Sequence, residues 1–106
     1  MSLKENIDHE IGTRFYYIEY PRGTPERFWK DGDGELVFIP DMGLDHLKAC
    51  IRRIEKDIEA FNKHWAGFSN GPAVQRKLLP LVEAKLDELR KAFTKESANK
   101  YPKNKK

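Results

Sequence analysis

A chain of 106 residues with a single cysteine, Cys50, is long enough for one small domain and cannot form an internal disulfide. Charged residues make up 35% and hydrophobic residues 39%, so the core must be thin and must depend on large aromatic side chains. No apolar run approaches the roughly 20 residues that span a bilayer, and no secretory signal is recognisable. We therefore expect a protein of the reducing cytoplasm.

The net charge of +3 is a property of the C-terminus. Residues 99–106 contain lysines at 100, 103, 105 and 106 and no acid, so residues 1–98 carry a net charge of −1. A domain that binds nucleic acid usually carries its basic patch on a folded face. We therefore predict a single α+β domain over residues 1–98, followed by a solvated basic tail over residues 99–106.

The N-terminal half is expected to contain the strands. Residues 1–12 are polar with isolated apolar side chains, which predicts a mobile arm or a short helical turn. Residues 13–20 are rich in β-branched and aromatic residues, the strongest strand pattern in the chain. Residues 26–30 and 35–39 predict two more strands, joined through Asp31-Gly32-Asp33-Gly34, since Asp-Gly is typical of a hairpin turn. We expect a short antiparallel sheet of three strands.

Two long helices are predicted in the C-terminal half. Over residues 44–65, apolar side chains recur alternately three and four positions apart, which places them on one stripe of a helix. A similar stripe over residues 73–97 predicts a second helix, and Pro80 within it predicts a kink or a division into two helices. The linker is short, so the helices should pack as an antiparallel hairpin. The predicted fold is α+β, with the three-stranded sheet packed on this helical hairpin.

Few residues suit catalysis or metal binding. His46 and Cys50 are four apart, a spacing that can supply two zinc ligands, but we interpret both as structural. The Asp31–Gly34 turn resembles the middle of a calcium loop. In the register that places Gly34 at the invariant glycine, however, Trp29 stands at the first ligand position and Pro40 at the position of the bidentate acid, which excludes an EF-hand. The sequence has no phosphate loop, dinucleotide fingerprint or paired-carboxylate motif. We therefore expect no enzymatic activity, no metal and no cofactor.

The centre of the chain resembles a pattern in small uncharacterised proteins of bacteriophages and prophages. In these proteins a tryptophan strand, a glycine turn and a short apolar strand precede a helix start with Asp-Met, three residues, then His-Leu. Here the corresponding residues run from Trp29 through the turn and Val37-Phe38-Ile39 to Asp41-Met42 and His46-Leu47. The resemblance covers residues 27–55. It implies structural roles for the matched positions Trp29, Gly34, Met42, His46 and Leu47. Of these, Met42 and His46 would belong to the corner where the helix begins, packed under the hairpin.

Two classes of function stay open. The first is a non-enzymatic protein-interaction module, such as a phage accessory protein that binds or modulates a host protein. It is favoured by aromatic side chains in excess of what so small a core can bury, and the candidate partner contacts are Phe61, Trp65 and Phe68. The open edges of the helix stripes also favour a homodimer. The alternative is nucleic-acid binding through the lysine tail and five further cations, Arg22, Arg27, Lys30, Arg52 and Arg53.

Overall fold

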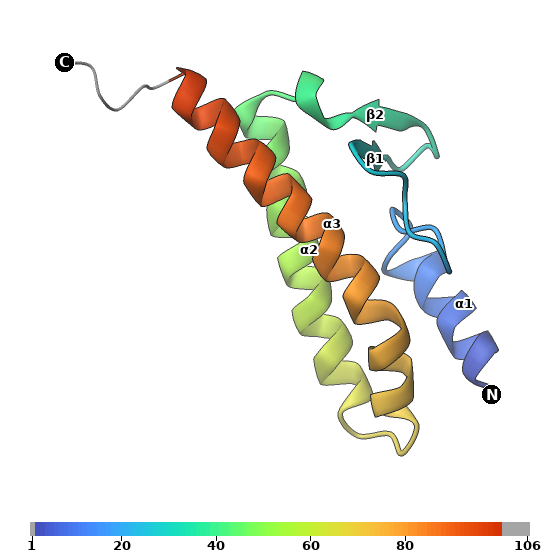
Figure 1. Ribbon diagram of the computed structural model, residues 1–106. Helices are drawn as coiled ribbons and strands as arrows, with labels where there is room; N and C mark the ends of the chain where they lie inside the picture. The colour runs from blue at the N-terminus through green and yellow to red at the C-terminus, as the bar shows by residue number, and fades with distance from the viewer. Residues whose placement is uncertain (1, 101–106) are drawn as a thin grey trace.

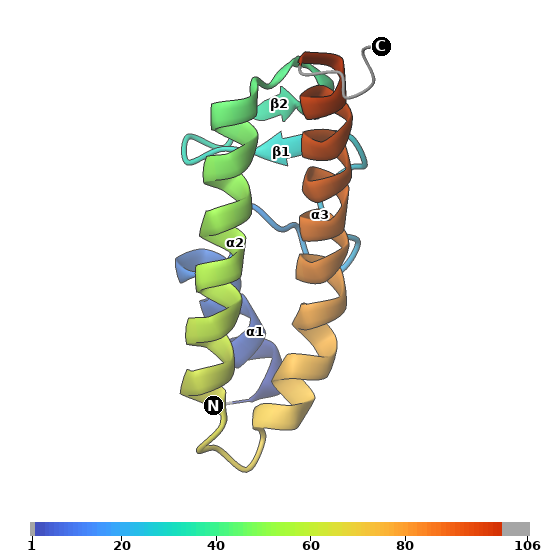
Figure 2. The same ribbon diagram turned by 90° about the vertical axis from the view of Figure 1, so that its left-hand side faces the viewer.

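Two long helices, α2 (Leu44–Trp65) and α3 (Gly71–Lys100), lie side by side and antiparallel (Figure 1). Behind them lies a second layer that contains α1 (Leu3–Thr13), β1 (Phe28–Lys30) and β2 (Leu36–Phe38) (Figure 2). A short 3-10 helix, η1 (Ile39–Asp41), joins β2 to α2. The computed structural model describes residues 2–100. The α+β class is confirmed, and α2 and α3 pair as the helical hairpin that the sequence predicts.

The helical hairpin follows the apolar periodicity closely. α2 has the predicted bounds and buries five residues on one face: Leu47, Cys50, Ile54, Phe61 and Trp65. α3 is longer than the predicted range of 73–97 and continues through Pro80 as one helix, so of the two alternatives predicted for this proline the division into two helices is wrong. Proline removes one helical hydrogen bond, but Leu78 and Val82 on either side are fully buried and hold the helix together.

The ends of α3 depend on two different features. At its start, a side chain on Gly71 would place Cβ 2.1 Å from the carbonyl oxygen of Trp65, so only glycine allows this close turn between the helices. At its end, α3 continues to Lys100, two residues past the predicted end of the domain at residue 98. The rest of the predicted basic tail, residues 101–106, lies outside the described residues.

The predicted strand over residues 13–20 does not form, so the sheet has two strands and not three. These residues leave α1 and continue as an irregular, turn-containing segment in which Phe15, Tyr17 and Ile18 are buried. The Ile18 N–H donates to the Phe15 carbonyl over 3.0 Å, a local bond that replaces a strand partner. Aromatic and β-branched residues are common in strands because they suit buried surfaces. Here these residues are buried from a loop, so the composition of residues 13–20 indicates burial correctly but a strand wrongly.

Residues 1–12 are more ordered than the sequence predicts. From Leu3 to Thr13 they form an 11-residue helix, α1, instead of a mobile arm or a short turn. Ser2 and Glu5 form a capping box: the Ser2 hydroxyl accepts from the Glu5 N–H over 3.2 Å, and the Glu5 carboxylate accepts from the Ser2 N–H over 2.9 Å. α1 contacts α3, and its buried face contains Ile7 and Glu10.

Candidate partner-binding surfaces

The three aromatic residues predicted to bind a partner have different environments. Phe61 is fully buried, with its ring centroid 5.1 Å from that of Phe15. Trp65 is 5% exposed, and its indole Nε1 donates to Glu10 Oε2 over 3.1 Å. Both are core residues, so their assignment as partner contacts is wrong. Only Phe68, which is 49% exposed, presents its ring at the surface.

Phe68 lies at the loop end of the helical hairpin. Its ring centroid is 5.3 Å from that of His64 and 5.1 Å from that of Trp65. These rings border a depression of about 420 Å³, completed by residues of α1 and of the loop between α2 and α3. A single exposed phenylalanine is ordinary on a protein surface. This end of the molecule therefore offers one aromatic contact and not an extended apolar patch.

The β-hairpin exposes a larger group of apolar side chains. On β2, Leu36 is 47% exposed and Phe38 is 36% exposed. Phe38 lies directly across from Phe28 of β1, with the two ring centroids 5.4 Å apart. Successive strand residues point to opposite faces, so Phe28, Leu36 and Phe38 share the face opposite Trp29. We call these three residues the outer hairpin face. Sequence reasoning did not identify it as a site.

The inner side of the hairpin fixes this orientation. Trp29 is 4% exposed, lies across from Val37, and stacks on the Tyr17 ring at a centroid distance of 4.7 Å. An aromatic side chain buries roughly 150–250 Å². A slip of one residue would expose Trp29 and turn Phe28 inward, so the strand register is strongly specified. The outer hairpin face is consequently held toward solvent.

The segment from Asp31 to Gly34 is a tight hairpin turn. The Asp31 Oδ1 accepts from the N–H groups of Asp33 and Glu35, both over 2.9 Å, and the Gly34 N–H donates to the Asp31 carbonyl over 3.0 Å. Gly34 has a φ of 84°, in the left-handed region that favours glycine. The Asp31 carboxylate is therefore engaged within the turn. Within residues 2–100, no group of three or more His, Cys, Asp or Glu side chains is placed to hold a metal ion.

The residues that share the phage-protein pattern lie mainly in the core. Trp29, Met42 and Leu47 are buried, and Gly34 forms the hairpin turn. His46 is exposed in the first turn of α2, whereas Cys50, one turn further, is buried. Burial raises the pKa of the Cys50 thiol to about 11. The thiol is therefore protonated at neutral pH, which disfavours its use as a nucleophile.

The cations predicted to bind nucleic acid are distributed over separate parts of the described chain. Arg22 and Arg27 lie in the loop before β1, alongside α3. Lys30 is the last residue of β1. Arg52 and Arg53 lie on α2, where the Arg53 Nε donates over 3.1 Å to an aspartate one turn along the same helix. These five side chains thus come from three separate parts of the described chain, namely the loop before β1, β1 itself and α2.

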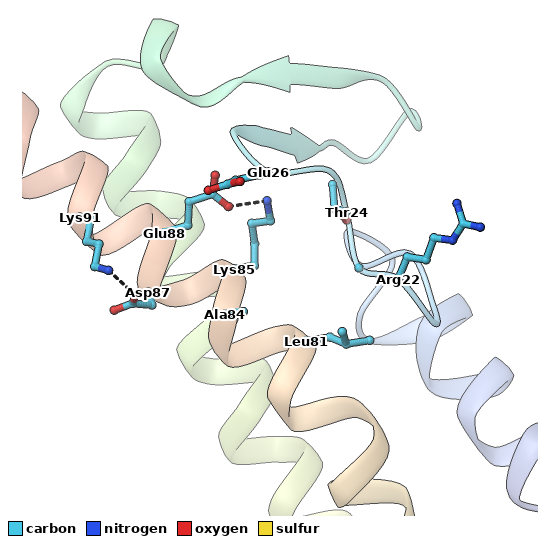
Figure 3. A pocket seen from close by; sticks show the side chains of 10 residues that line it. Arg22, Thr24, Glu26, Leu81, Ala84, Lys85, Asp87, Glu88 and Lys91 are labelled. Atoms are coloured by element: carbon cyan, nitrogen blue, oxygen red, sulfur yellow. Dashed lines mark hydrogen bonds and ion pairs between the residues drawn. The ribbon is translucent and has the colours of Figure 1, made fainter.

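A cleft of about 430 Å³ separates the loop before β1 from α3 (Figure 3). Lys85 is 4% exposed, and its Nζ donates to the carbonyls of Pro25 (3.2 Å) and Phe28 (2.8 Å) and to Glu88 Oε1 (2.7 Å). These three acceptors match the three N–H donors of an ammonium group. The other carboxylate oxygen of Glu88 accepts from the backbone N–H of Arg27. Lys85 and Glu88 therefore clamp the loop to α3, which leaves the ammonium no donor for a ligand.

A second polar contact ties the segment after α1 to α2. Tyr17 is fully buried, and its hydroxyl donates to Asp57 Oδ2 over 2.6 Å; the Arg53 Nε donates to the same oxygen. Burial, and then the bond to Asp57, raises the pKa of Tyr17 far above its ordinary value, while the bond to Asp57 raises the pKa of Arg53. The phenol stays protonated at neutral pH, so it serves as a structural hydrogen-bond donor.

Comparison with known proteins gives no match to a family model, to a curated protein or to a solved structure. Within the described range, each helix is too short or too polar to cross a membrane. A functional assignment therefore depends on the surface and chemistry of the chain itself.

Proposed function

We propose that this chain is a non-enzymatic protein-interaction module that binds a partner protein through the outer hairpin face. The observation that carries the proposal is the exposure of Leu36 and Phe38 beside Phe28 on a hairpin whose other face is buried. Burial of this apolar surface against a partner would contribute roughly 25 cal/mol per Å² to the free energy of binding. Adjacent exposed apolar side chains on a fixed backbone are a common feature of protein interfaces.

The form of the hairpin favours contact through side chains and not through a strand edge. β1 and β2 have three residues each, so an added strand would find few backbone partners. Pro40, two residues after β2, has no N–H to donate. The two facing rings of Phe28 and Phe38 form a broader contact, and Leu36 extends it toward the turn.

The chemistry of the buried groups supports a binding role over a catalytic one. Lys85 is bonded to three acceptors, Tyr17 is bonded to Asp57, and Cys50 is buried with a raised thiol pKa of about 11. Each of these three buried groups is therefore engaged in packing or in joining elements, and is not free to act as an acid, base or nucleophile.

The resemblance of residues 27–55 to small phage proteins extends this proposal. On that basis the chain is an accessory protein that binds a host protein in the cytoplasm and changes its activity. The nucleic-acid alternative has less support, because Arg22 and Arg27 lie along α3 whereas Arg52 and Arg53 lie on α2.

The test compares two matched substitutions in a pull-down from a lysate of the native host. Phe38→Asp places a charge on the outer hairpin face, and Leu3→Asp makes a similar change on α1, where Leu3 has the same exposed fraction of 36%. We expect a protein retained by the wild type and by Leu3→Asp to be lost with Phe38→Asp. Circular dichroism and melting temperature must show that both variants fold. Equal retention by both variants would exclude this face as the binding site.

A further inference from the structure

One long face of the α2–α3 layer carries no other element of the described chain, because α1 and the hairpin both lie behind it (Figure 2). Part of this face is a groove of about 430 Å³ whose lining comes only from α2 and α3. Ile51 of α2 and Phe93 of α3 line the groove, and from each of them apolar residues recur seven apart along its helix. They are Ile51 and Ile58 on α2 and Leu79, Leu86 and Phe93 on α3. All except Leu86 are only partly buried, so they keep apolar surface open to solvent.

The stripe on α3 is complementary to its own reverse. Between the three apolar positions lie Glu83 and Arg90, so the order is apolar, acid, apolar, base, apolar. When a second copy runs antiparallel about Leu86, Leu79 meets Phe93 and Leu86 meets Leu86, while Glu83 comes to within one residue of Arg90. An apolar residue every seventh position is typical of helices that pack along one another.

The pattern of residues on α2 is also complementary to its own reverse, and it reverses near Glu55. Reversal of the helix about Glu55 brings Ile51 to within one residue of Ile58, and Arg52 to within one residue of Glu59. Arg52 and Glu59 are separated by about 10 Å along one helix, given a rise of 1.5 Å per residue, so they do not pair within a chain. Across an antiparallel contact they would pair twice.

The two residues about which the patterns reverse, Glu55 on α2 and Leu86 on α3, lie at a similar level along the helical hairpin. The Arg90 Nη2 donates to Glu55 Oε2 over 2.6 Å, which sets Glu55 close to the middle of the α3 stripe. This ion pair also compensates the Glu55 charge, which would otherwise meet its own copy near the axis. Leu86, one turn before Arg90, then lies at the axis on α3.

We infer that this groove is a self-association surface, on which two copies pack face to face about a twofold axis perpendicular to the helices. α2 then packs on α2 and α3 on α3, both antiparallel, and the dimer has a four-helix core. An axis parallel to the helices would instead place α2 against α3. Glu59 and Glu83 lie at the same level, between the Asn62–Gln75 and Glu55–Arg90 contacts, so that arrangement would oppose like charges. This inference does not depend on the outer hairpin face.

The test is a charge exchange on α2, read by sedimentation equilibrium of the full chain from micromolar to submillimolar concentration at low salt. The wild type should approach twice the chain mass of 12.4 kDa. Arg52→Glu and Glu59→Arg should each weaken association roughly tenfold, because each exposed contact changes from attraction to repulsion and occurs twice. The double variant should recover most of the wild-type affinity.

Lys77→Glu is the matched control, since it changes the net charge as Arg52→Glu does at an exposed position off the α3 stripe. It should leave the association within about twofold of wild type. A single 12.4 kDa species at every concentration would overturn the inference. So would a dimer that neither single variant weakens, or a double variant that associates no better than the singles. All three altered positions are exposed, so circular dichroism should show folded variants.

Discussion

Ile54 offers a quantitative test of the core. It lies on the buried face of α2 and is 0% exposed. Ile54→Ala removes three carbons; at ~0.8 kcal/mol for each buried methylene, the transfer contribution alone is about 2.4 kcal/mol. The cavity left between α2, α3 and the second layer adds to this, so we expect a loss of about 2–5 kcal/mol in the free energy of unfolding. A domain of this size has a total of about 5–15 kcal/mol, so the change is a large fraction.

The assay is urea unfolding at low micromolar concentration, followed by far-ultraviolet circular dichroism and by the fluorescence of the two buried tryptophans, Trp29 and Trp65. Ile11→Ala is the control, because it makes the same substitution at a partly buried position of α1 and should cost less than half as much. A loss below about 0.5 kcal/mol for Ile54→Ala would refute the packing described here, since that is the range of ordinary surface substitutions.

Three further changes test other parts of the structure. Glu10→Ala removes the acceptor of the Trp65 indole N–H and should cost about 1–3 kcal/mol in urea unfolding, whereas Glu10→Gln, which keeps an acceptor, should cost less. The Cys50 thiol has a pKa of about 11 in the fold against 9.0 for an ordinary thiol, so its contribution is present below pH 9.0 and is lost as the pH rises toward 11. The difference in unfolding free energy between wild type and Cys50→Ala should therefore shift in favour of the variant by up to about 1.4 kcal/mol per pH unit in that range, and a constant difference would contradict the burial of the thiol. Deletion of residues 99–106 should change the melting temperature by less than about 2 °C, because Asn99 is exposed; a drop of several degrees would show that the tail, through Tyr101, packs on the domain.

The helices could be predicted from sequence because their pattern is long and repeated. α2 has an apolar residue every three or four positions for 22 residues, which few other structures would require. The segment from residue 13 to 20 shows the opposite case, since its aromatic residues indicate burial but not the backbone conformation that achieves it. For α1, the capping residues Ser2 and Glu5 were a readable signal of a helix start, but the weak apolar periodicity that follows obscured it.

The candidate surfaces depend on facts that a local pattern does not contain. Phe61 and Phe38 are the same residue type, yet one is fully buried and the other is 36% exposed, because the first packs against Phe15 in the core and the second lies on the side of the hairpin opposite the buried Trp29. On α3, Leu86 and Phe93 belong both to the apolar residues spaced seven apart on the open side and to the apolar stripe that packs in the core. In the sequence these two sets therefore merge into one wide apolar face. Only the position of the second layer separates the side that is covered from the side that is open (Figure 2).

The two proposed surfaces lie on opposite sides of the α2–α3 layer, which has a consequence for binding. The outer hairpin face points away from the helices, because Trp29 on its other side is buried against the core. A dimer formed through the groove would therefore leave both hairpins accessible and would display two identical sites facing in opposite directions. Such a dimer cannot place both sites on one flat surface, but it can join two separate partner molecules. Self-association would then cross-link a partner that is itself oligomeric, with a gain in apparent affinity that a monomeric partner would not show.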